Sequence, residues 1–124
     1  HVEDHIDALL LVAEDGEIGK KYCIGGHNER TNNEVVRMIC KCLDKYNPIN
    51  KPHSKLIEYV EDRPGHDKRY AIDASLIKEK LSWEPKINFT NGIDQTVRWY
   101  LENISWCEKI QSRSGYKGER IGLK

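Results

Sequence analysis

The sequence lacks net charge, long apolar runs and a secretion signal, and each absence excludes a class of protein. Its 20 Lys and Arg residues are balanced by 20 Asp and Glu residues, so the chain has no bulk attraction for nucleic acid. The longest apolar stretch, residues 8–13, is far too short to cross a bilayer, and no signal-peptide pattern opens the chain. We therefore expect a cytoplasmic protein that binds neither nucleic acid nor membranes.

Metal-binding spacing is also missing. The four cysteines form no Cys-x-x-Cys pair, and Cys40 and Cys42 would point in different directions on the helix predicted there. Histidines at positions 5, 27, 53 and 66 are too dispersed to form a ligand set, and each is better explained as a surface or hydrogen-bonded structural residue. We expect reduced, buried thiols and no metal site.

Two motifs of nicotinamide-dependent catalysis are absent as well. Gly16-x-x-Gly19 lacks the third Gly of a dinucleotide-binding turn and follows a predicted helix instead of a strand. No Tyr is followed four residues later by a Lys that would lower the pKa of its hydroxyl. The chain therefore carries no recognisable catalytic residues and no cofactor-binding site of its own.

Helical periodicity accounts for most of what is present. It predicts a first helix capped by Asp4, with Ile6, Leu9, Leu10 and Ala13 facing the core. A second helix is expected to begin at the Thr31-x-x-Glu34 capping box, and a third at Asp73, with Ala74, Ile77 and Leu81 facing the core. Thr90 is expected to cap a last helix, and Trp83 to cover the core. Short extended or strand segments are predicted at 21–24, 57–61 and 69–72.

The segment Asp62-Arg63-Pro64-Gly65-His66 places a guanidinium and an imidazole on one short turn. Arg presents a planar fork that matches a phosphate, and Lys68 and Arg69 add positive charge nearby. A solvated turn with Arg63 paired to Asp62 or Asp67 also explains these residue types, and residue types alone favour this second interpretation. Asn32, at the start of the second helix, could likewise bind a ligand or only satisfy the first turn.

A longer pattern is more specific. Asp62-Arg63-Pro64-Gly65-His66-Asp67-x-Arg69-Tyr70-Ala71-Ile72-Asp73 closely resembles a segment of the dTDP-glucose 4,6-dehydratases, members of the extended short-chain dehydrogenase/reductase superfamily. Other stretches resemble the same family in the same order, over residues 1 to about 103: Val2-Glu3-Asp4-His5, Tyr22-x-Ile24-Gly25-Gly26-His27-Asn28-Glu29 and Leu81-x-Trp83-x-Pro85.

The resemblance implies an α/β fold: the C-terminal, substrate-binding part of such an enzyme, mostly helices with a few short strands, without the Rossmann half. It implies a nucleotide-sugar-binding domain over residues 1–106. The composition of residues 107–124, basic with few apolar residues, predicts a tail that is disordered or docked on a partner. The chain begins without Met, so we expect it to belong to a longer protein. The NAD site and the catalytic residues would lie upstream.

The resemblance also implies function. The intact enzyme, a homodimer, would oxidise, dehydrate and reduce dTDP-glucose to dTDP-4-keto-6-deoxyglucose, while this chain alone would be inactive. The residues implied to bind the nucleotide diphosphate sugar are Asn32, Asp62, Arg63, Pro64, Gly65 and His66. A fragment of a nucleotide-sugar epimerase or decarboxylase, a stand-alone nucleotide-binding module and a purely structural domain remain as alternatives.

Overall fold

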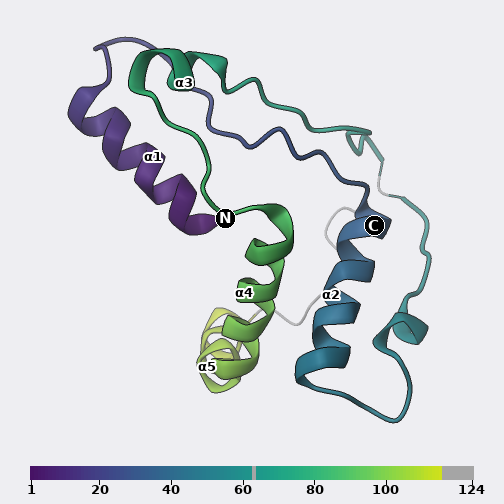
Figure 1. Ribbon diagram of the computed structural model, residues 1–124. Helices are drawn as coiled ribbons and strands as arrows, with labels where there is room; N and C mark the ends of the chain where they lie inside the picture. The colour runs from purple at the N-terminus through teal and green to yellow at the C-terminus, as the bar shows by residue number, and fades with distance from the viewer. Residues whose placement is uncertain (63, 116–124) are drawn as a thin grey trace. The chain divides into compact units, whose positions relative to one another are not determined.

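The computed structural model describes residues 1–62 and 64–115, which form helices joined by long extended segments (Figure 1). The elements, in chain order, are α1 (Val2–Asp15), α2 (Asn32–Tyr46), the 3₁₀ turn η1 (His53–Leu56), α3 (Ser75–Leu81), α4 (Phe89–Glu102) and α5 (Ile104–Ser114). Within the described residues there is no β-strand. The prediction of short strands is therefore wrong for this chain, because an extended segment becomes a strand only when a neighbouring backbone completes its hydrogen bonds.

The chain divides into two compact units, where the sequence predicts a single domain over residues 1–106. The first unit contains His1–Thr31 and Arg69–Gly92, and the second contains Asn32–Lys68 and the chain from Ile93 onward. Each unit is therefore assembled from two segments that are distant in the sequence.

The core of the first unit forms where α1 packs against α3. Ala74 and Ile77 are buried there with Ala8, and Trp83 closes the cluster at 8% exposure. This confirms the predicted inward face of α3 and the role of Trp83 as a core lid. Tyr22 and Ile24, two residues apart on extended backbone, pack against the same cluster.

The buried face of α1 differs from the predicted one. Ala8 is fully buried, and Leu11 and Val12 pack beside it, whereas Ile6, Leu9 and Leu10 are about half exposed. The sequence of α1 is apolar on more than one side, so periodicity alone could not decide which side meets α3.

Asp4 does not cap α1, contrary to the prediction. The cap is His1, whose ring nitrogen accepts a hydrogen bond from the Glu3 N–H. Asp4 is only 5% exposed, and its two carboxylate oxygens accept the N–H groups of Lys86 and Ile87, each at 3.0 Å. It thus fastens the segment between α3 and α4 to α1.

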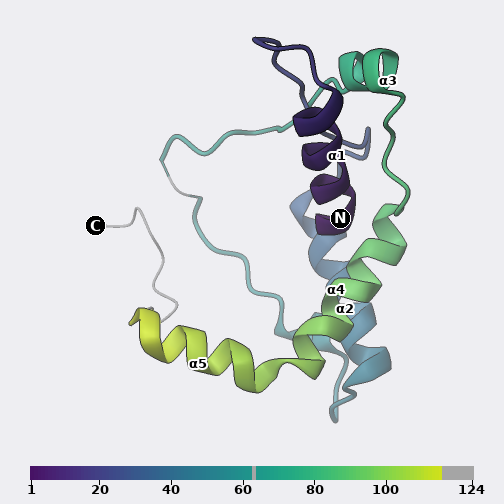
Figure 2. The same ribbon diagram turned by 90° about the vertical axis from the view of Figure 1, so that its left-hand side faces the viewer.

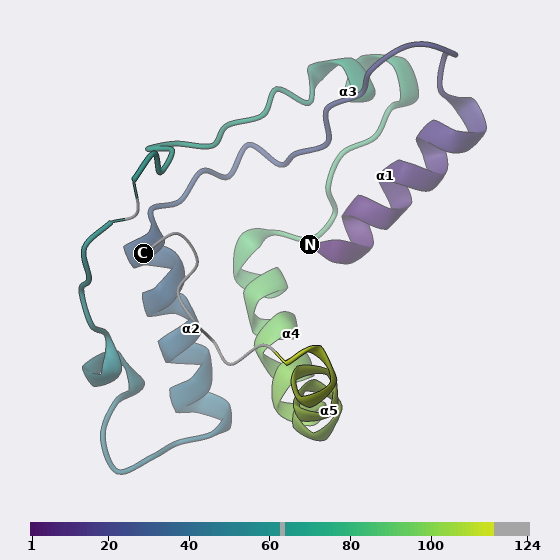
Figure 3. The ribbon, with the colours of Figure 1, turned by 180° about the vertical axis from the view of Figure 1, so that it is seen from behind.

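Two extended segments, 20–31 and 69–74, run side by side in the first unit (Figure 3). They approach closely at Gly25, where an added Cβ would lie 3.2 Å from the Cβ of Ile72. A larger residue at Gly25 would therefore push these segments apart.

In the second unit, a polar cluster joins α2 to α4. The Tyr46 hydroxyl donates to Asp94 at 2.7 Å and accepts from Lys45 at 2.6 Å, and Arg98 Nε donates to Asp94 at 3.1 Å. The bond from Tyr46, followed by the charge of Lys45, lowers the pKa of the Asp94 carboxyl. Apolar residues recur at helical spacing along α2 and are buried or half-buried, as this periodicity predicts: Val35, Ile39, Cys42, Leu43 and Tyr46.

The last helices also differ from the prediction. The Asn91 N–H donates to Asn88 Oδ1 at 2.9 Å, so Asn88 rather than Thr90 caps α4. After α4, the chain turns at Asn103 into α5, the yellow helix of Figure 2. The tail was expected to be disordered from residue 107, but residues 107–114 are helical; the remainder of that prediction, from residue 116, falls outside the described residues.

Candidate functional site

A groove of about 690 Å³ lies within the second unit, between α2 and the chain that follows it. One wall is α2 and the other is η1 with the extended segment after it, which runs back alongside α2 (Figures 1 and 3). The groove is lined by Asn32, Asn33, Val36, Cys40, Leu43, His53, Leu56, Ile57, Glu58, Tyr59, Val60, Asp62 and His66.

A hydrogen-bonded pair at the end of α2 positions the second wall. Asp44 Oδ1 accepts the His53 backbone N–H at 2.8 Å and lies 2.6 Å from His53 Nδ1. These bonds, the backbone one first, lower the pKa of the Asp44 carboxyl. His53 is 8% exposed, which confirms its interpretation as a hydrogen-bonded structural residue. The pair makes the chain reverse, so that residues 57–62 return toward the beginning of α2.

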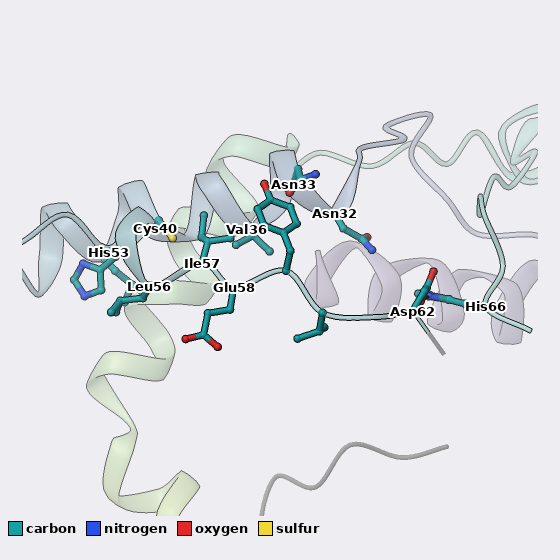
Figure 4. A pocket seen from close by; sticks show the side chains of 13 residues that line it. Asn32, Asn33, Val36, Cys40, His53, Leu56, Ile57, Glu58, Asp62 and His66 are labelled. Atoms are coloured by element: carbon teal, nitrogen blue, oxygen red, sulfur yellow. Dashed lines mark hydrogen bonds and ion pairs between the residues drawn. The ribbon is translucent and has the colours of Figure 1, made fainter. Parts of the chain in front are cut away.

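The groove has a polar end and an apolar stretch (Figure 4). At the polar end, Asn32 and Asn33 of the first turn of α2 face the same space as Asp62 and His66. Further along, Val36, Cys40 and Leu43 line the α2 wall, and Leu56 and Ile57 line the other. The helix N-terminus adds a partial positive charge at the polar end.

His66 is held in one orientation by its neighbour. Its Nδ1 lies 2.6 Å from Asp62 Oδ1, and the His66 side chain is 29% exposed. An ionised carboxylate can only accept, so Nδ1 carries the proton and donates to Asp62. Nε2 is then the ring atom that meets a ligand, as an acceptor when the ring is neutral and as a donor when it is protonated.

The structure brings together three of the six residues implied to bind substrate: Asn32, Asp62 and His66 line the same groove. Pro64 and Gly65 form the turn between them without lining it, and Gly65 has a φ of +70° that favours glycine. Arg63 lies outside the described residues.

Arg69, one of the two cations that follow the turn, pairs with a carboxylate. Arg69 belongs to the first unit, where its guanidinium lies 3.4 Å from the Glu29 carboxylate. The pKa of the Glu29 carboxyl is lowered, first by a backbone hydrogen bond and then by Arg69. Arg69 is therefore paired within the first unit.

Sequence reasoning missed the α2 wall beyond Asn32. Val36 and Cys40 follow Asn32 at intervals of four residues, so they lie on the same helix face as Asn32. That spacing could have extended the predicted site along α2. The prediction of buried thiols is confirmed for Cys40 and Cys42 but wrong for Cys23, which is exposed, while Cys107 is half-buried.

Two further kinds of site can be sought among the described residues, a metal site and a dinucleotide-binding turn. No group of three His, Cys, Asp or Glu residues there could hold a metal ion. Gly16 follows α1, and an added Cβ would lie 2.3 Å from the Val12 carbonyl oxygen, so this glycine packs on its own helix and forms no cradle for a pyrophosphate. Among the described helices, none is both long and apolar enough to span a membrane.

The sequence model of the GDP-mannose 4,6 dehydratase family matches residues 1–96. The chain belongs to this family. It is 50% identical over 123 residues to a dTDP-glucose 4,6-dehydratase of Xanthomonas campestris, and 50% identical over 128 residues to one of Escherichia coli. The matches cover 98% and 99% of this chain, but 35% of each relative, in its C-terminal part. The chain thus spans about a third of the length of the curated relatives it matches.

Solved structures agree with these matches. The chain is similar to dTDP-glucose 4,6-dehydratase from Bacillus anthracis in complex with NAD, with a TM-score of 0.73 and 46% identity. It is also similar to DesIV, a dTDP-glucose 4,6-dehydratase from Streptomyces venezuelae with NAD and TYD bound, with a TM-score of 0.76 and 36% identity. Each match covers 86% of this chain and 31% of the solved chain.

Proposed function

We propose that this chain is the nucleotide-sugar-binding part of a dTDP-glucose 4,6-dehydratase. The observation that carries the proposal is the meeting of Asn32 with Asp62 and His66 at one end of the groove, because these segments are 30 residues apart in the sequence. Relatives about 50% identical carry the dTDP-glucose 4,6-dehydratase name, which favours this enzyme over an epimerase or a decarboxylase.

The groove suits a diphosphate held from several directions. Arg63 would bind the diphosphate through its planar fork, and the turn at Pro64 and Gly65 would set the direction of that side chain. His66, oriented by Asp62, would present Nε2 to a phosphate oxygen, and Asn32 would donate from the first turn of α2. A small, local group of donors of this kind matches a diphosphate better than a polymer.

In the intact enzyme, this chain would bind and orient the substrate. NAD would be held by the rest of a family-length chain and would supply reversible hydride transfer during conversion of dTDP-glucose to dTDP-4-keto-6-deoxyglucose. Fixing the diphosphate determines where the sugar lies, and such positioning can contribute several kcal/mol to lowering a barrier. We also expect the intact enzyme to assemble as a homodimer, which sedimentation can test.

The test is an NMR titration of the 124-residue chain with dTDP, and separately with GDP because the family model bears the name of a GDP-sugar enzyme. We expect saturable shifts of the Asn32, Asp62 and His66 amides with dTDP and weaker ones with GDP. His66→Ala should weaken dTDP binding about 10-fold, the loss expected for a charge-assisted hydrogen bond. His5→Ala, at an exposed position on α1, is the matched control and should bind normally.

The titration can also contradict the proposal. Saturable shifts confined to other residues would place the nucleotide elsewhere, and equal affinity for the two nucleotides would remove the preference for dTDP. A chimera can also be made by replacing the matched segment of the Xanthomonas campestris relative with this chain. If neither this chain nor the chimera binds dTDP at millimolar concentration, the nucleotide site is excluded.

A further inference from the structure

The segment Leu56–Val60 exposes an unusual run of large apolar side chains beside the groove. Leu56, Tyr59 and Val60 are 53%, 75% and 67% exposed, and all three line the groove. Ile57 lies next to Val36 of α2, whereas Glu58 points to the other side (Figure 4). The segment therefore alternates as a strand does, although no strand forms in the described residues.

The backbone of this segment also lacks hydrogen-bond partners among the described residues. Within the described part of the chain, the N–H and C=O groups of Glu58, Tyr59 and Val60 form no hydrogen bond with other protein groups. Ile57, just before them, has the φ of −71° and ψ of 121° of extended backbone. Extended backbone with open donors and acceptors is a template for another strand.

We infer that residues 57–60 are a docking edge for a β-strand, and that the strand comes from the part of a family-length chain that this chain does not span. The matched relatives are about three times as long as this chain, which covers 35% of them. The incoming strand would complete the hydrogen bonds along one edge of residues 58–60 and cover part of Tyr59 and Val60. This inference rests on family membership and is independent of nucleotide binding.

Charge argues against a second copy of this chain as the occupant. A symmetric antiparallel pair of these segments would place Glu58 and Glu61 of one copy beside the same residues of the other. Like charges on facing strands are destabilising. A strand from elsewhere in a family-length chain carries no such symmetry requirement.

Docking would also bear on the candidate site, because Asp62 and His66 follow directly after the edge. A strand paired along 57–60 would restrict the backbone that leads into the turn. The docked strand would then lie beside the apolar stretch of the groove. The polar end at Asn32 would stay open to the ligand.

Amide hydrogen exchange tests the inference. The protein to compare with the free 124-residue chain is the Xanthomonas campestris relative in which the matched segment is replaced by this chain. A single docked strand pairs alternate N–H groups, so we expect exchange to slow by about 100-fold in the longer protein either at Tyr59 or at both Glu58 and Val60. If the chimera does not fold, amide exchange is measured instead in the unmodified relative, at the positions that align with residues 58–60.

Proline variants separate backbone pairing from side-chain contact. Successive N–H groups of a strand point to opposite edges, so one of Glu58→Pro and Tyr59→Pro should abolish protection in the chimera. Glu58→Ala and Tyr59→Ala keep the N–H and are the matched controls, which should retain protection of the edge. Circular dichroism of each variant checks that the helices are unchanged.

Two outcomes would overturn the inference. Unprotected amides at residues 58–60 in both the chimera and the intact relative would show that no strand docks there. Protection that develops in the free chain as its concentration rises would identify a second copy as the occupant instead.

Discussion

Asp4 is an acidic residue of the kind usually found on the surface, yet it lies in a buried environment. It is a carboxylate at 5% exposure that accepts two backbone N–H groups. Asp7, one turn later, is half exposed and pairs with the Lys86 ammonium at 3.2 Å. Two Asp residues on one helix thus contact the same segment but differ in burial and in the groups that they bind.

This difference gives the first prediction. Asp4→Ala should lower the free energy of unfolding by roughly 2–4 kcal/mol, because it leaves two N–H groups without their charged acceptor. Asp7→Ala should cost less than about 1 kcal/mol, as expected for an exposed ion pair. Denaturant titration of both variants measures the contrast, and equal losses would contradict the assigned role of Asp4.

Arg63 carries the second prediction, set in the family-length chimera because only there can turnover be measured. If Arg63 binds the diphosphate, Arg63→Ala removes a charge-assisted hydrogen bond worth roughly 1.5–3 kcal/mol, a loss of about 10- to 150-fold in kcat/KM. Arg63→Lys should recover only part of this loss, because lysine keeps the charge without the planar fork.

The control for Arg63 is Arg37→Ala, an exposed cation on α2 that does not line the groove. It should leave kcat/KM unchanged. An Arg63→Ala variant that folds and turns over dTDP-glucose as well as the parent would remove Arg63 from the site. Full rescue by lysine would instead indicate an electrostatic contact without bidentate geometry.

At the scale of elements, the caps determine where helices begin, and α4 provides a clean comparison. Asn88→Ala should destabilise the protein by ~1 kcal/mol through loss of the bond from the Asn91 N–H. Thr90→Ala, two residues later and exposed on α4, should change stability by less than about 0.5 kcal/mol. Thermal unfolding distinguishes the two, and the reverse order would restore Thr90 as the cap.

The junction between α2 and α4 should be sensitive to acid. The Tyr46 hydroxyl lowers the pKa of the Asp94 carboxyl below its ordinary value of 3.8. A carboxyl whose pKa is lower in the folded state stabilises the protein above its unfolded pKa, and this stabilisation is lost as the pH falls through the folded pKa. The contribution of Asp94 should therefore be constant at neutral pH and disappear below pH 3.8.

The measurement is the unfolding midpoint in denaturant as a function of pH. Asp94→Asn should be less stable than the parent at pH 7, and the difference should shrink below about pH 4, where the parent carboxylate becomes protonated. Tyr46→Phe keeps the Asp94 carboxylate but removes the hydroxyl that donates to it, so it should flatten the same part of the plot of stability against pH. A difference that does not vary with pH would assign the effect to packing.

At the scale of the whole molecule, the chain combines a candidate substrate groove with a sequence that has neither of two motifs of nicotinamide-dependent catalysis. We predict that the isolated chain neither binds NAD nor dehydrates dTDP-glucose, because the dinucleotide turn and the Tyr-x-x-x-Lys pair are absent from its sequence. Calorimetry with NAD and a turnover assay test this. Measurable NAD affinity would contradict the assignment of the cofactor to the rest of the family-length chain.

Local patterns in the sequence predict α1 to α4 and the turn, but they do not predict α5. The helices at 32–46 and 75–81 were recognised from apolar periodicity and capping residues, and Asp62 to His66 from its Pro-Gly turn, because these features depend on bonds between near neighbours. The motif around this turn was also specific enough to indicate the family, which the match over residues 1–96 confirms.

Only the tertiary structure decided which surfaces meet. The buried face of α1, the acceptor role of Asp4 and the groove between α2 and residues 56–62 all depend on contacts between segments far apart in the chain. Such contacts are selected by the whole set of available partners, and several apolar faces of this chain could have competed for them. The same reason explains the failed strand predictions, since a strand requires a partner that alternation in its own sequence cannot supply.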